Sequence, residues 1–290
     1  MSGSFRNKLR LIDDRLLNDQ VPRRILSIGF RPDGFVFCVM DVDQFRFMAL
    51  EQYTFDHQPA EDEFFQLFSS FKQTHPILGM SFEKVSLSYF SPNLVLIPEA
   101  LYKPGDETGL FDASTKMPPA GQLMTDSLNI LRARGVYMVP AWLTDLGDQF
   151  GCDYLIKHDG SVLIENILAS QRLENWQADL VLHVKPTQCD IIVLHGEDLK
   201  YYQTFSIQAF EDVIYYLFFV VNEFGLDSTS LKIVLLGDVG MDTAEYAMLS
   251  GLFREVAIPR RNDVFHYSQV FDQLPYHFHY NLFNMVTCGS

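Results

Sequence analysis

The sequence predicts an α/β protein of two lobes, because one arrangement of secondary structure is found twice along the chain. Each copy contains three short strands, an amphipathic helix and a further strand, followed by a turn marked by Gly or Pro. The copies span Arg24 to Ala100 and Asp179 to Arg254, and their first turns carry Pro32 and Pro186, which lie 186 − 32 = 154 positions apart. This spacing predicts duplicated lobes, since solenoid repeats recur about every 20 to 50 residues.

The first copy begins with two apolar strands, 25–31 and 35–41, joined by Pro32-Asp33-Gly34. Proline fixes φ and glycine tolerates positive φ, so this tripeptide predicts a tight turn. A third strand is expected over 45–55, and the short connections predict an antiparallel meander. A helix is expected from Pro59, and a strand over 83–89 completes the copy. The helix carries phenylalanines at helical spacing, which predicts a face packed on the sheet rather than an aromatic binding site: Phe64, Phe65, Phe68 and Phe71.

The second copy repeats this order with different residues. Strands are expected over 179–184, 189–195 and 199–205, followed by a helix over 208–224 that ends at Gly225. The apolar run 231–236 predicts a strand buried on both faces, because half-exposed strands alternate apolar and polar residues. The Gly237-Asp238-Val239-Gly240 turn and a helix over 243–254 follow.

The remaining segments are less regular. The stretch 103–122 contains Pro, Gly and Asp without periodicity, which predicts a mobile loop. Extended structure is expected over 91–98, 123–131, 136–139 and 153–157, and helices over 141–150 and 162–171, the latter carrying the chain between the lobes. Beyond Pro259 the aromatic content predicts a tail packed on the body. The expected lobes are therefore 1–172, with an irregular insertion around 103–122, and 173–290, with the C-terminal tail.

Composition limits the function. A formal net charge of −15, with no stripe of Lys or Arg, argues against a nucleic-acid partner. The first twenty residues are charged throughout and no apolar run approaches the roughly 20 residues of a membrane span, so a cytoplasmic protein is expected. The cysteines lie far apart without a Cys-x-x-Cys pair, which predicts reduced thiols: Cys38, Cys152, Cys189 and Cys288.

The chain resembles the actin-like ATPase superfamily, which has a ribonuclease H-like fold. The resemblance rests on the duplicated topology and on LSIGFRPDGF at 26–35, LVLIP at 94–98 and the stretch 180–205, and it covers essentially the whole chain. Within the superfamily the chain is most similar to an uncharacterised bacterial family of unknown function, and more distantly to PilM and FtsA. The resemblance implies two lobes, each with a mixed βββαβα sheet flanked by helices.

The resemblance also implies an Asp-x-Gly motif in each lobe's first hairpin, where the Asp holds Mg²⁺ and the Gly lets amides approach phosphate. Ser27-Ile28-Gly29 stands at the first motif, which keeps the glycine and lacks the acid. His183-Val184-Lys185 stands at the second, where both are missing. Neither a hydroxyl nor an imidazole replaces a hard carboxylate, and Pro32 and Pro186 each remove an amide from the turns. The sequence therefore predicts no catalytic residues for phosphoryl transfer.

Several residues nevertheless stand at positions where relatives hold a nucleotide. The turn containing Gly237, Asp238 and Gly240 matches the element that contacts adenosine, which keeps ATP open as a cofactor, although a tight strand-to-helix turn explains the glycines equally. The phosphate-hairpin positions are weaker candidates: Gly29, Asp33, Gly34, His183 and Lys185. His277-Phe278-His279 has no third ligand at a suitable spacing, so no metal site is predicted.

Three functions remain open from the sequence. The first is a non-catalytic binding or scaffolding module for a protein or peptide partner, supported by the intact duplicated scaffold and the missing acids. The second is an ATPase or small-molecule kinase that uses a rearranged set of acids, Asp33, Asp190 and Asp238. The third is a sensor that binds a small ligand without chemistry.

Overall fold

The computed structural model describes residues 5–18, 20–55, 61–91, 93–114, 121–173 and 176–287. Pro59 and Cys288, which entered the sequence predictions, lie outside these residues. The chain forms two compact units. The first comprises Met1–Leu163, Asp263–Gln273 and Asn281–Ser290, and the second comprises Ile164–Asn262 and Leu274–Tyr280. The division into lobes 1–172 and 173–290 stays a prediction; the two units differ from it by placing most of the tail with the first unit.

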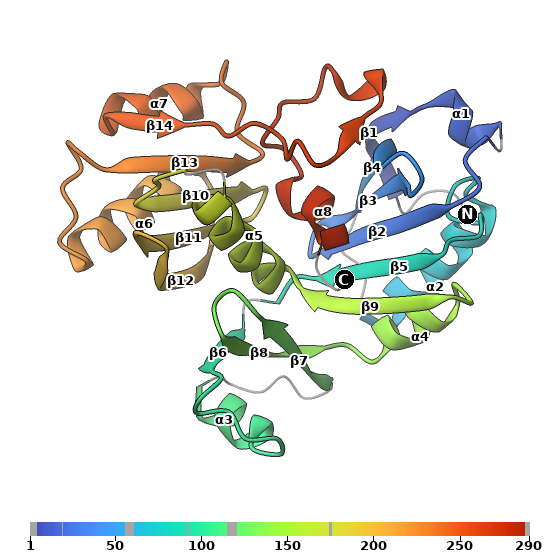
Figure 1. Ribbon diagram of the computed structural model, residues 1–290, viewed down its shortest axis with the longest axis horizontal. Helices are drawn as coiled ribbons and strands as arrows, with labels where there is room; N and C mark the ends of the chain where they lie inside the picture. The colour runs from blue at the N-terminus through green and yellow to red at the C-terminus, as the bar shows by residue number, and fades with distance from the viewer. Residues whose placement is uncertain are drawn as a thin grey trace. The chain divides into compact units, whose positions relative to one another are not determined.

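The first unit is built on a seven-stranded mixed sheet of order β1-β4-β3-β2-β5-β9, with β15 also pairing with β4 (Figure 1). Its strands are β1 (Phe5–Ile12), β2 (Arg24–Arg31), β3 (Gly34–Asp41), β4 (Arg46–Phe55), β5 (Lys84–Tyr89), β9 (Asp153–His158) and β15 (His266–Tyr267). Strands β2, β3 and β4 form the predicted antiparallel meander, and β5 and β9 return parallel to β2.

The second unit is built on a five-stranded sheet of order β12-β11-β10-β13-β14. Its strands are β10 (Leu180–Lys185), β11 (Gln188–His195), β12 (Asp198–Ser206), β13 (Lys232–Gly237) and β14 (Glu255–Ala257). Strands β10, β11 and β12 are antiparallel, while β13 and β14 run parallel to β10. The order β4-β3-β2-β5-β9 in the first sheet therefore matches the order β12-β11-β10-β13-β14 in the second. Counted along the chain, both are the third, second, first, fourth and fifth strands of the repeat, which confirms the duplication.

The two first hairpins also agree in their turns. Each is a two-residue turn that begins with a proline, Pro32 in one and Pro186 in the other. In each turn the carbonyl of the second residue accepts a hydrogen bond from the residue that follows the last paired position of the third strand. The amide of Phe55 donates to the carbonyl of Asp33 at 3.0 Å, and the amide of Ile207 donates to the carbonyl of Thr187 at 2.9 Å. The equivalence of Pro32 and Pro186 predicted from the sequence is confirmed.

Helices cover one face of each sheet because their apolar stripes need a partner. In the first unit, the predicted phenylalanine face of α2 (Glu61–Thr74) packs on the sheet, where the ring of Phe68 lies 5.2 Å from that of Phe30 and 4.9 Å from that of Phe35. In the second unit, Leu217 of α6 (Phe210–Glu223) and Leu249 of α7 (Ala244–Leu252) are buried in one core with β10 and β11. Helix α5 (Asp159–Leu173) carries the chain from the first unit into the second.

The prediction of a structureless loop over 103–122 is wrong in part. Residues Glu107–Ser114 form helix α3, while residues 115–120 lie outside the described part of the chain. Phe111 of this helix is buried beside Ile97 and Val136, in a small core of its own. That core belongs to a three-stranded sheet of order β6-β8-β7, made of β6 (Leu94–Pro98), β7 (Gln122–Leu128) and β8 (Ala133–Val139).

The tail packs on the sheet as its aromatic content predicts. In the first unit, the ring of Phe47 on β4 lies 5.4 Å from that of Phe265 and 4.8 Å from that of Phe283. Five short helical elements complete the structure: α1 (Asp14–Leu17), α4 (Trp142–Asp148), η1 (Gln269–Phe271), α8 (Tyr280–Asn284) and η2 (Met285–Thr287).

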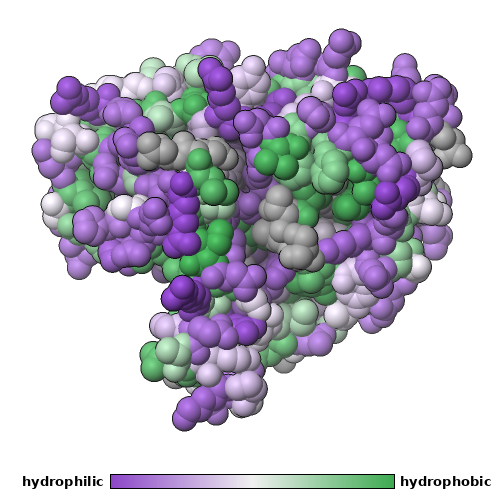
Figure 2. Space-filling view, viewed as in Figure 1, coloured by the Kyte–Doolittle hydropathy of each residue, from purple (hydrophilic) through white to green (hydrophobic). Residues whose placement is uncertain are grey.

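Among the described residues, the helices are too short or too polar to cross a membrane. Figure 2 shows hydrophilic residues interspersed with hydrophobic ones over the face in view.

Candidate functional site

Ser27 and Gly29, which stand at the first predicted phosphate motif, are packed within the first unit. Gly29 on β2 pairs with Val36 on β3 and Ser88 on β5. A Cβ added at Gly29 would lie 3.2 Å from Ser88 Oγ and 3.9 Å from Leu282 of the tail. Ser27, which stands where relatives carry an acid, is buried beside Cys38. The tightest of these contacts is with Ser88 on the neighbouring strand, so packing within the first unit accounts for the surviving glycine.

The turn of that hairpin has a structural explanation as well. A Cβ at Gly34 would lie 2.0 Å from the carbonyl oxygen of Tyr53, so the close approach of β3 to β4 requires glycine here. Arg31 Nε lies 3.4 Å from a carboxylate oxygen of Asp33, which offsets the charge of the nearest acid.

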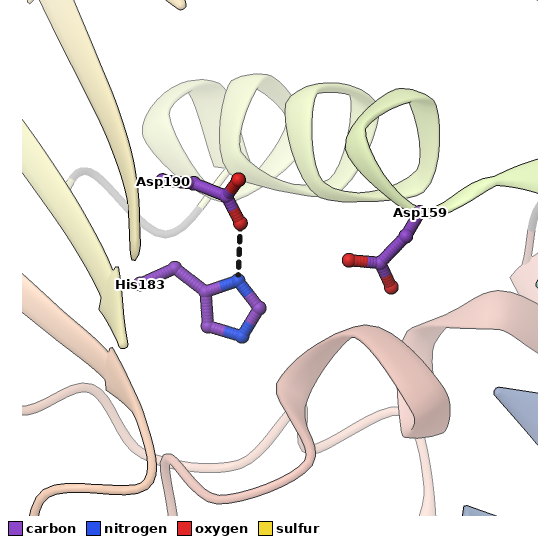
Figure 3. A group of neighbouring side chains, drawn as sticks. All are labelled: Asp159, His183 and Asp190. Carbon is purple, nitrogen blue, oxygen red and sulfur yellow. Dashed lines mark hydrogen bonds and ion pairs between the residues drawn. The ribbon is translucent and has the colours of Figure 1, made fainter. Parts of the chain in front are cut away.

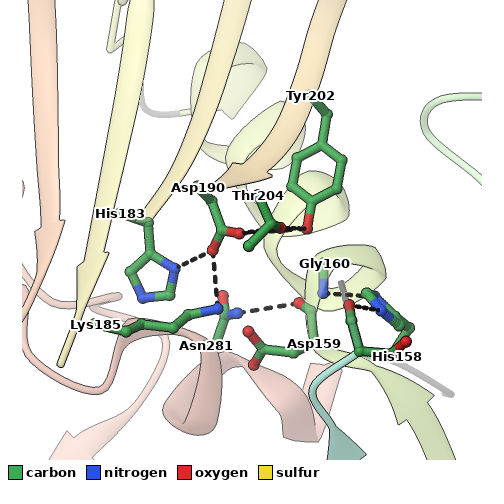
Figure 4. Close-up of polar contacts among 10 residues, drawn as sticks. His158, Asp159, Gly160, His183, Lys185, Asp190, Tyr202, Thr204 and Asn281 are labelled. Atoms are coloured by element: carbon green, nitrogen blue, oxygen red, sulfur yellow. Dashed lines mark hydrogen bonds and ion pairs between the residues drawn. The ribbon is translucent and has the colours of Figure 1, made fainter. Parts of the chain in front are cut away.

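A polar row crosses the sheet beside the second hairpin (Figure 4). His183 on β10 lies opposite Asp190 on β11, and Asp190 lies opposite Thr204 on β12. The carboxylate of Asp190 accepts hydrogen bonds from His183 Nδ1 at 3.0 Å and from Thr204 Oγ1 at 2.6 Å. It also pairs with Lys185 Nζ at 2.9 Å and accepts a longer bond from Tyr202 at 3.4 Å. Both oxygens of Asp190 are thus engaged by neighbours in its own unit.

Asp190 is fully buried, and the charges around it keep its side chain ionised. Burial alone would raise the pKa of the carboxyl, but the charge of Lys185 and the hydrogen bonds from His183 and Thr204 hold the pKa well below its usual range. A carboxylate only accepts hydrogen bonds, so Nδ1 of His183 carries the proton that points at Asp190 (Figure 3). The row is an ion-pair network in which both oxygens of the buried acid are held by neighbours in the second unit.

A second polar group, in the first unit, fixes the start of α5. His158 Nδ1 accepts the amide hydrogen of Gly160 at 2.9 Å, while its Nε2 donates to the carbonyl of Ser91 at 2.8 Å. The side-chain amide of Asn281 donates to the carbonyl of Asp159 at 3.0 Å (Figure 4). The amide of Gly160 is one of the free N–H groups at the N-terminus of α5, and the bonds to Ser91 and from Asn281 attach that terminus to the rest of the first unit.

The Gly237 to Gly240 turn begins at the carboxyl end of β13, beside the parallel strand β10. Gly237 has φ +89°, and a Cβ there would lie 1.9 Å from the carbonyl oxygen of Val184. The amide of Gly237 donates to the carbonyl of His277 at 3.1 Å, that of Asp238 donates to Val184 at 2.9 Å, and that of Val239 donates to Gly237 at 3.0 Å. Three of the four amides of this turn are therefore hydrogen-bonded within the chain itself.

His277 closes this turn from the tail segment of the second unit. Its Nε2 donates to the carbonyl of Val239 at 2.6 Å, so Nδ1 is the unprotonated nitrogen, and it is buried without a hydrogen-bond partner among the described residues. Burial lowers the pKa of His277, because a charged imidazole would lose its hydration. The sequence pattern treated His277 only as a zinc candidate, and its hydrogen bond to the turn was missed.

The burial of His277 against the turn predicts that the free energy of unfolding depends on pH. The folded-state pKa of His277 lies below that of the unfolded chain, about 6.5, so the unfolded state binds the extra proton first and the free energy of unfolding falls as the pH drops below that value. One such proton gives a slope of at most about 1.4 kcal/mol per pH unit. Urea denaturation between pH 7.5 and 5 measures it in the wild type and in His277→Gln, which keeps a side-chain donor. Equal pH dependence in both proteins would show that His277 is not the group responsible.

The structure brings some predicted site residues together. His183 and Lys185 share the Asp190 row, and a Cβ at Gly237 would lie 3.0 Å from the His183 ring. Gly29, Asp33 and Gly34 belong to the first unit. Whether any of these residues binds a nucleotide stays a prediction.

The duplicated sheets, with their prolyl hairpins and parallel return strands, define an actin-like ATPase fold. The chain belongs to the family described as "Protein of unknown function (DUF3822)", whose model matches residues 13–256. The resemblance predicted from the sequence is thus confirmed.

Two solved structures illustrate the likeness. A Bacteroides thetaiotaomicron protein, described as having an actin-like ATPase fold and unknown function, superposes with a TM-score of 0.69 at 17% identity, over 83% of this chain and 92% of that one. The PilM-PilN type IV pilus biogenesis complex matches with a TM-score of 0.64 at 10% identity, over 92% of this chain and 98% of that one. No curated protein sequence matches. At these identities the comparisons show the fold.

Proposed function

We propose that the protein is a non-catalytic binding or scaffolding module on an actin-like body. The observation that carries the proposal is the state of Asp190. This carboxylate is the nearest acid to the second phosphate-side hairpin, and it accepts bonds from His183, Lys185, Thr204 and Tyr202. An acid that is paired with a buried lysine and hydrogen-bonded by a histidine is a poor ligand for Mg²⁺, and phosphoryl transfer on this fold depends on a metal-holding acid.

The first unit supports the same conclusion. Ser27 replaces the acid of the first hairpin, and the neighbouring Asp33 faces Arg31. In the second unit, the amides of Gly237 and Asp238 are bonded within the chain. The rearranged set of Asp33, Asp190 and Asp238 thus contains two acids that are already paired with cations.

A protein or peptide partner is the ligand class we favour. The fold neighbour described as the PilM-PilN complex is itself an assembly of proteins, which makes partner binding a role that this fold supports. The net charge of −15 disfavours nucleic acid, and a cytoplasmic location agrees with free thiols at Cys38, Cys152 and Cys189.

The test is turnover. The purified protein, incubated with ATP and Mg²⁺, is expected to release no phosphate above a heat-inactivated sample, with a purified ATPase as the positive control. Saturable Mg²⁺-dependent hydrolysis that is lost in Asp33→Asn or Asp190→Asn would replace the proposal with the ATPase alternative.

A further inference from the structure

The outer ridge of α6 is an aromatic stripe with a carboxylate at each end. Glu211, Tyr215, Phe219 and Glu223 follow one another at intervals of four residues, so they lie along one side of the helix. All four are exposed, Tyr215 by 66% and Phe219 by 51%. The opposite side of α6, which includes Leu217 and Val221, is buried in the core of the second unit.

Helix α7 extends this apolar surface. It packs on the same core as α6, and the ring of Phe253 at its end stacks on Phe218 of α6 at 5.4 Å. Met248 and Leu252, four residues apart on α7, are 40% and 43% exposed. We call Tyr215, Phe219, Met248 and Leu252 the α6–α7 surface. These side chains lie on the outward sides of two helices that pack on one core, and exposed apolar patches mark interaction sites more often than scattered side chains do.

The charges along the segment that carries the α6–α7 surface are mostly negative. From Ala209 to Arg254 the chain has seven acidic residues and two basic ones, Lys232 and Arg254, and the ammonium of Lys232 lies 3.3 Å from Glu255. Asp212 is occupied in capping α6, since it accepts the amides of Gln208 and Ala209. Glu211 and Glu223 make no ion pair with any described residue. At a rise of 1.5 Å per residue, they stand about 18 Å apart along the helix.

We infer that the α6–α7 surface binds a basic amphipathic helix of a partner protein. This inference rests on the proposed function and names its surface and partner class. Apolar side chains of such a helix would cover Tyr215 and Phe219, and Lys or Arg residues about 18 Å apart would meet Glu211 and Glu223. A second copy of the chain fits poorly, because two such ridges side by side would oppose carboxylates to carboxylates. An anionic membrane is repelled by the same charges.

The probe is a fluorescein-labelled amphipathic helical peptide of eighteen residues, with leucines along one face and lysines twelve positions apart. Its matched partner carries glutamates in place of those lysines. Anisotropy titrations are expected to show saturable binding of the lysine peptide that weakens with salt. The double variant Glu211→Lys/Glu223→Lys is expected to bind it about tenfold less well and to prefer the glutamate peptide. The double variant Tyr215→Ser/Phe219→Ser is expected to bind the lysine peptide about tenfold less well, because less apolar surface is buried on binding.

The controls make the inference falsifiable. Leu101→Ser, an exposed apolar position in the first unit, is expected to bind like the wild type. Thermal unfolding should be little changed in every variant, because the substituted side chains are exposed. The inference fails if the wild type does not bind the lysine peptide, or if it binds both peptides equally. Self-association or flotation with phosphatidylglycerol vesicles that is abolished by Tyr215→Ser/Phe219→Ser would also overturn it. None of these assays contains nucleotide, so their failure is distinguishable from failure of the turnover test.

Discussion

Asp190→Ala is expected to lower the free energy of unfolding by about 3–5 kcal/mol, because it leaves two buried basic side chains without their counter-charge. Lys185 and His183 both contact this carboxylate, and each is less than one-tenth exposed. Urea denaturation monitored by tryptophan fluorescence and by circular dichroism measures the change.

The matched control is Asp198→Ala on β12, an acid that pairs with Lys200 at the surface and should cost less than about 1 kcal/mol. The pH dependence gives a second readout. Because the folded-state pKa of Asp190 lies below that of the unfolded chain, its contribution is complete above about pH 4 and is lost as the pH falls further. In Asp190→Asn this acid-induced loss should be smaller. Equal costs for Asp190→Ala and Asp198→Ala would contradict the network.

Gly237→Ala is expected to destabilise the protein by about 3 kcal/mol or more. The new Cβ would lie 1.9 Å from the carbonyl oxygen of Val184, so the turn must move away from β10, and φ at this position is +89°. Displacing the turn also breaks the bonds from the amides of Gly237 and Asp238. Thermal and urea denaturation measure the loss.

Gly196→Ala is the control for backbone conformation alone. Gly196 also has positive φ, +62°, but a Cβ there meets nothing within 4 Å. Only the left-handed conformation is penalised, at about 1–2 kcal/mol. If the two substitutions cost the same, the close contact between the turn and β10 is not what fixes Gly237.

The strands of the repeated unit could be predicted because each is a short apolar run closed by strong turn chemistry. Strand β14, helix α1 and the short elements of the tail were not predicted, and two further misses, β1 and α3, have clear physical reasons. Strand β1 carries Arg6, Lys8 and Arg10, since it lies at the edge of the sheet and faces water on one side. Its alternation with Leu9 and Leu11 is the signal that could have identified it. Helix α3 has eight residues, of which Phe111 is buried, and such a helix is too short for periodicity to show.

The site could be predicted only in outline. The sequence places His183 and Lys185 on one strand face and shows that acids are missing from both hairpins. The position of Asp190 opposite His183 was missed, although the two-residue turn at Pro186 and Thr187 fixes the register of this hairpin and could have predicted it. The contact of His277 with Val239 joins residues 38 positions apart, and no local pattern encodes it.

Titration calorimetry with ATP, carried out with and without Mg²⁺, is the decisive measurement of whether the hairpins still handle a metal-bound phosphate. Because both hairpins lack a free acid at the motif, Mg²⁺ is expected to leave any affinity for ATP unchanged. An affinity that rises tenfold or more with Mg²⁺, and that Asp33→Asn or Asp190→Asn removes while the variant stays folded, would contradict it.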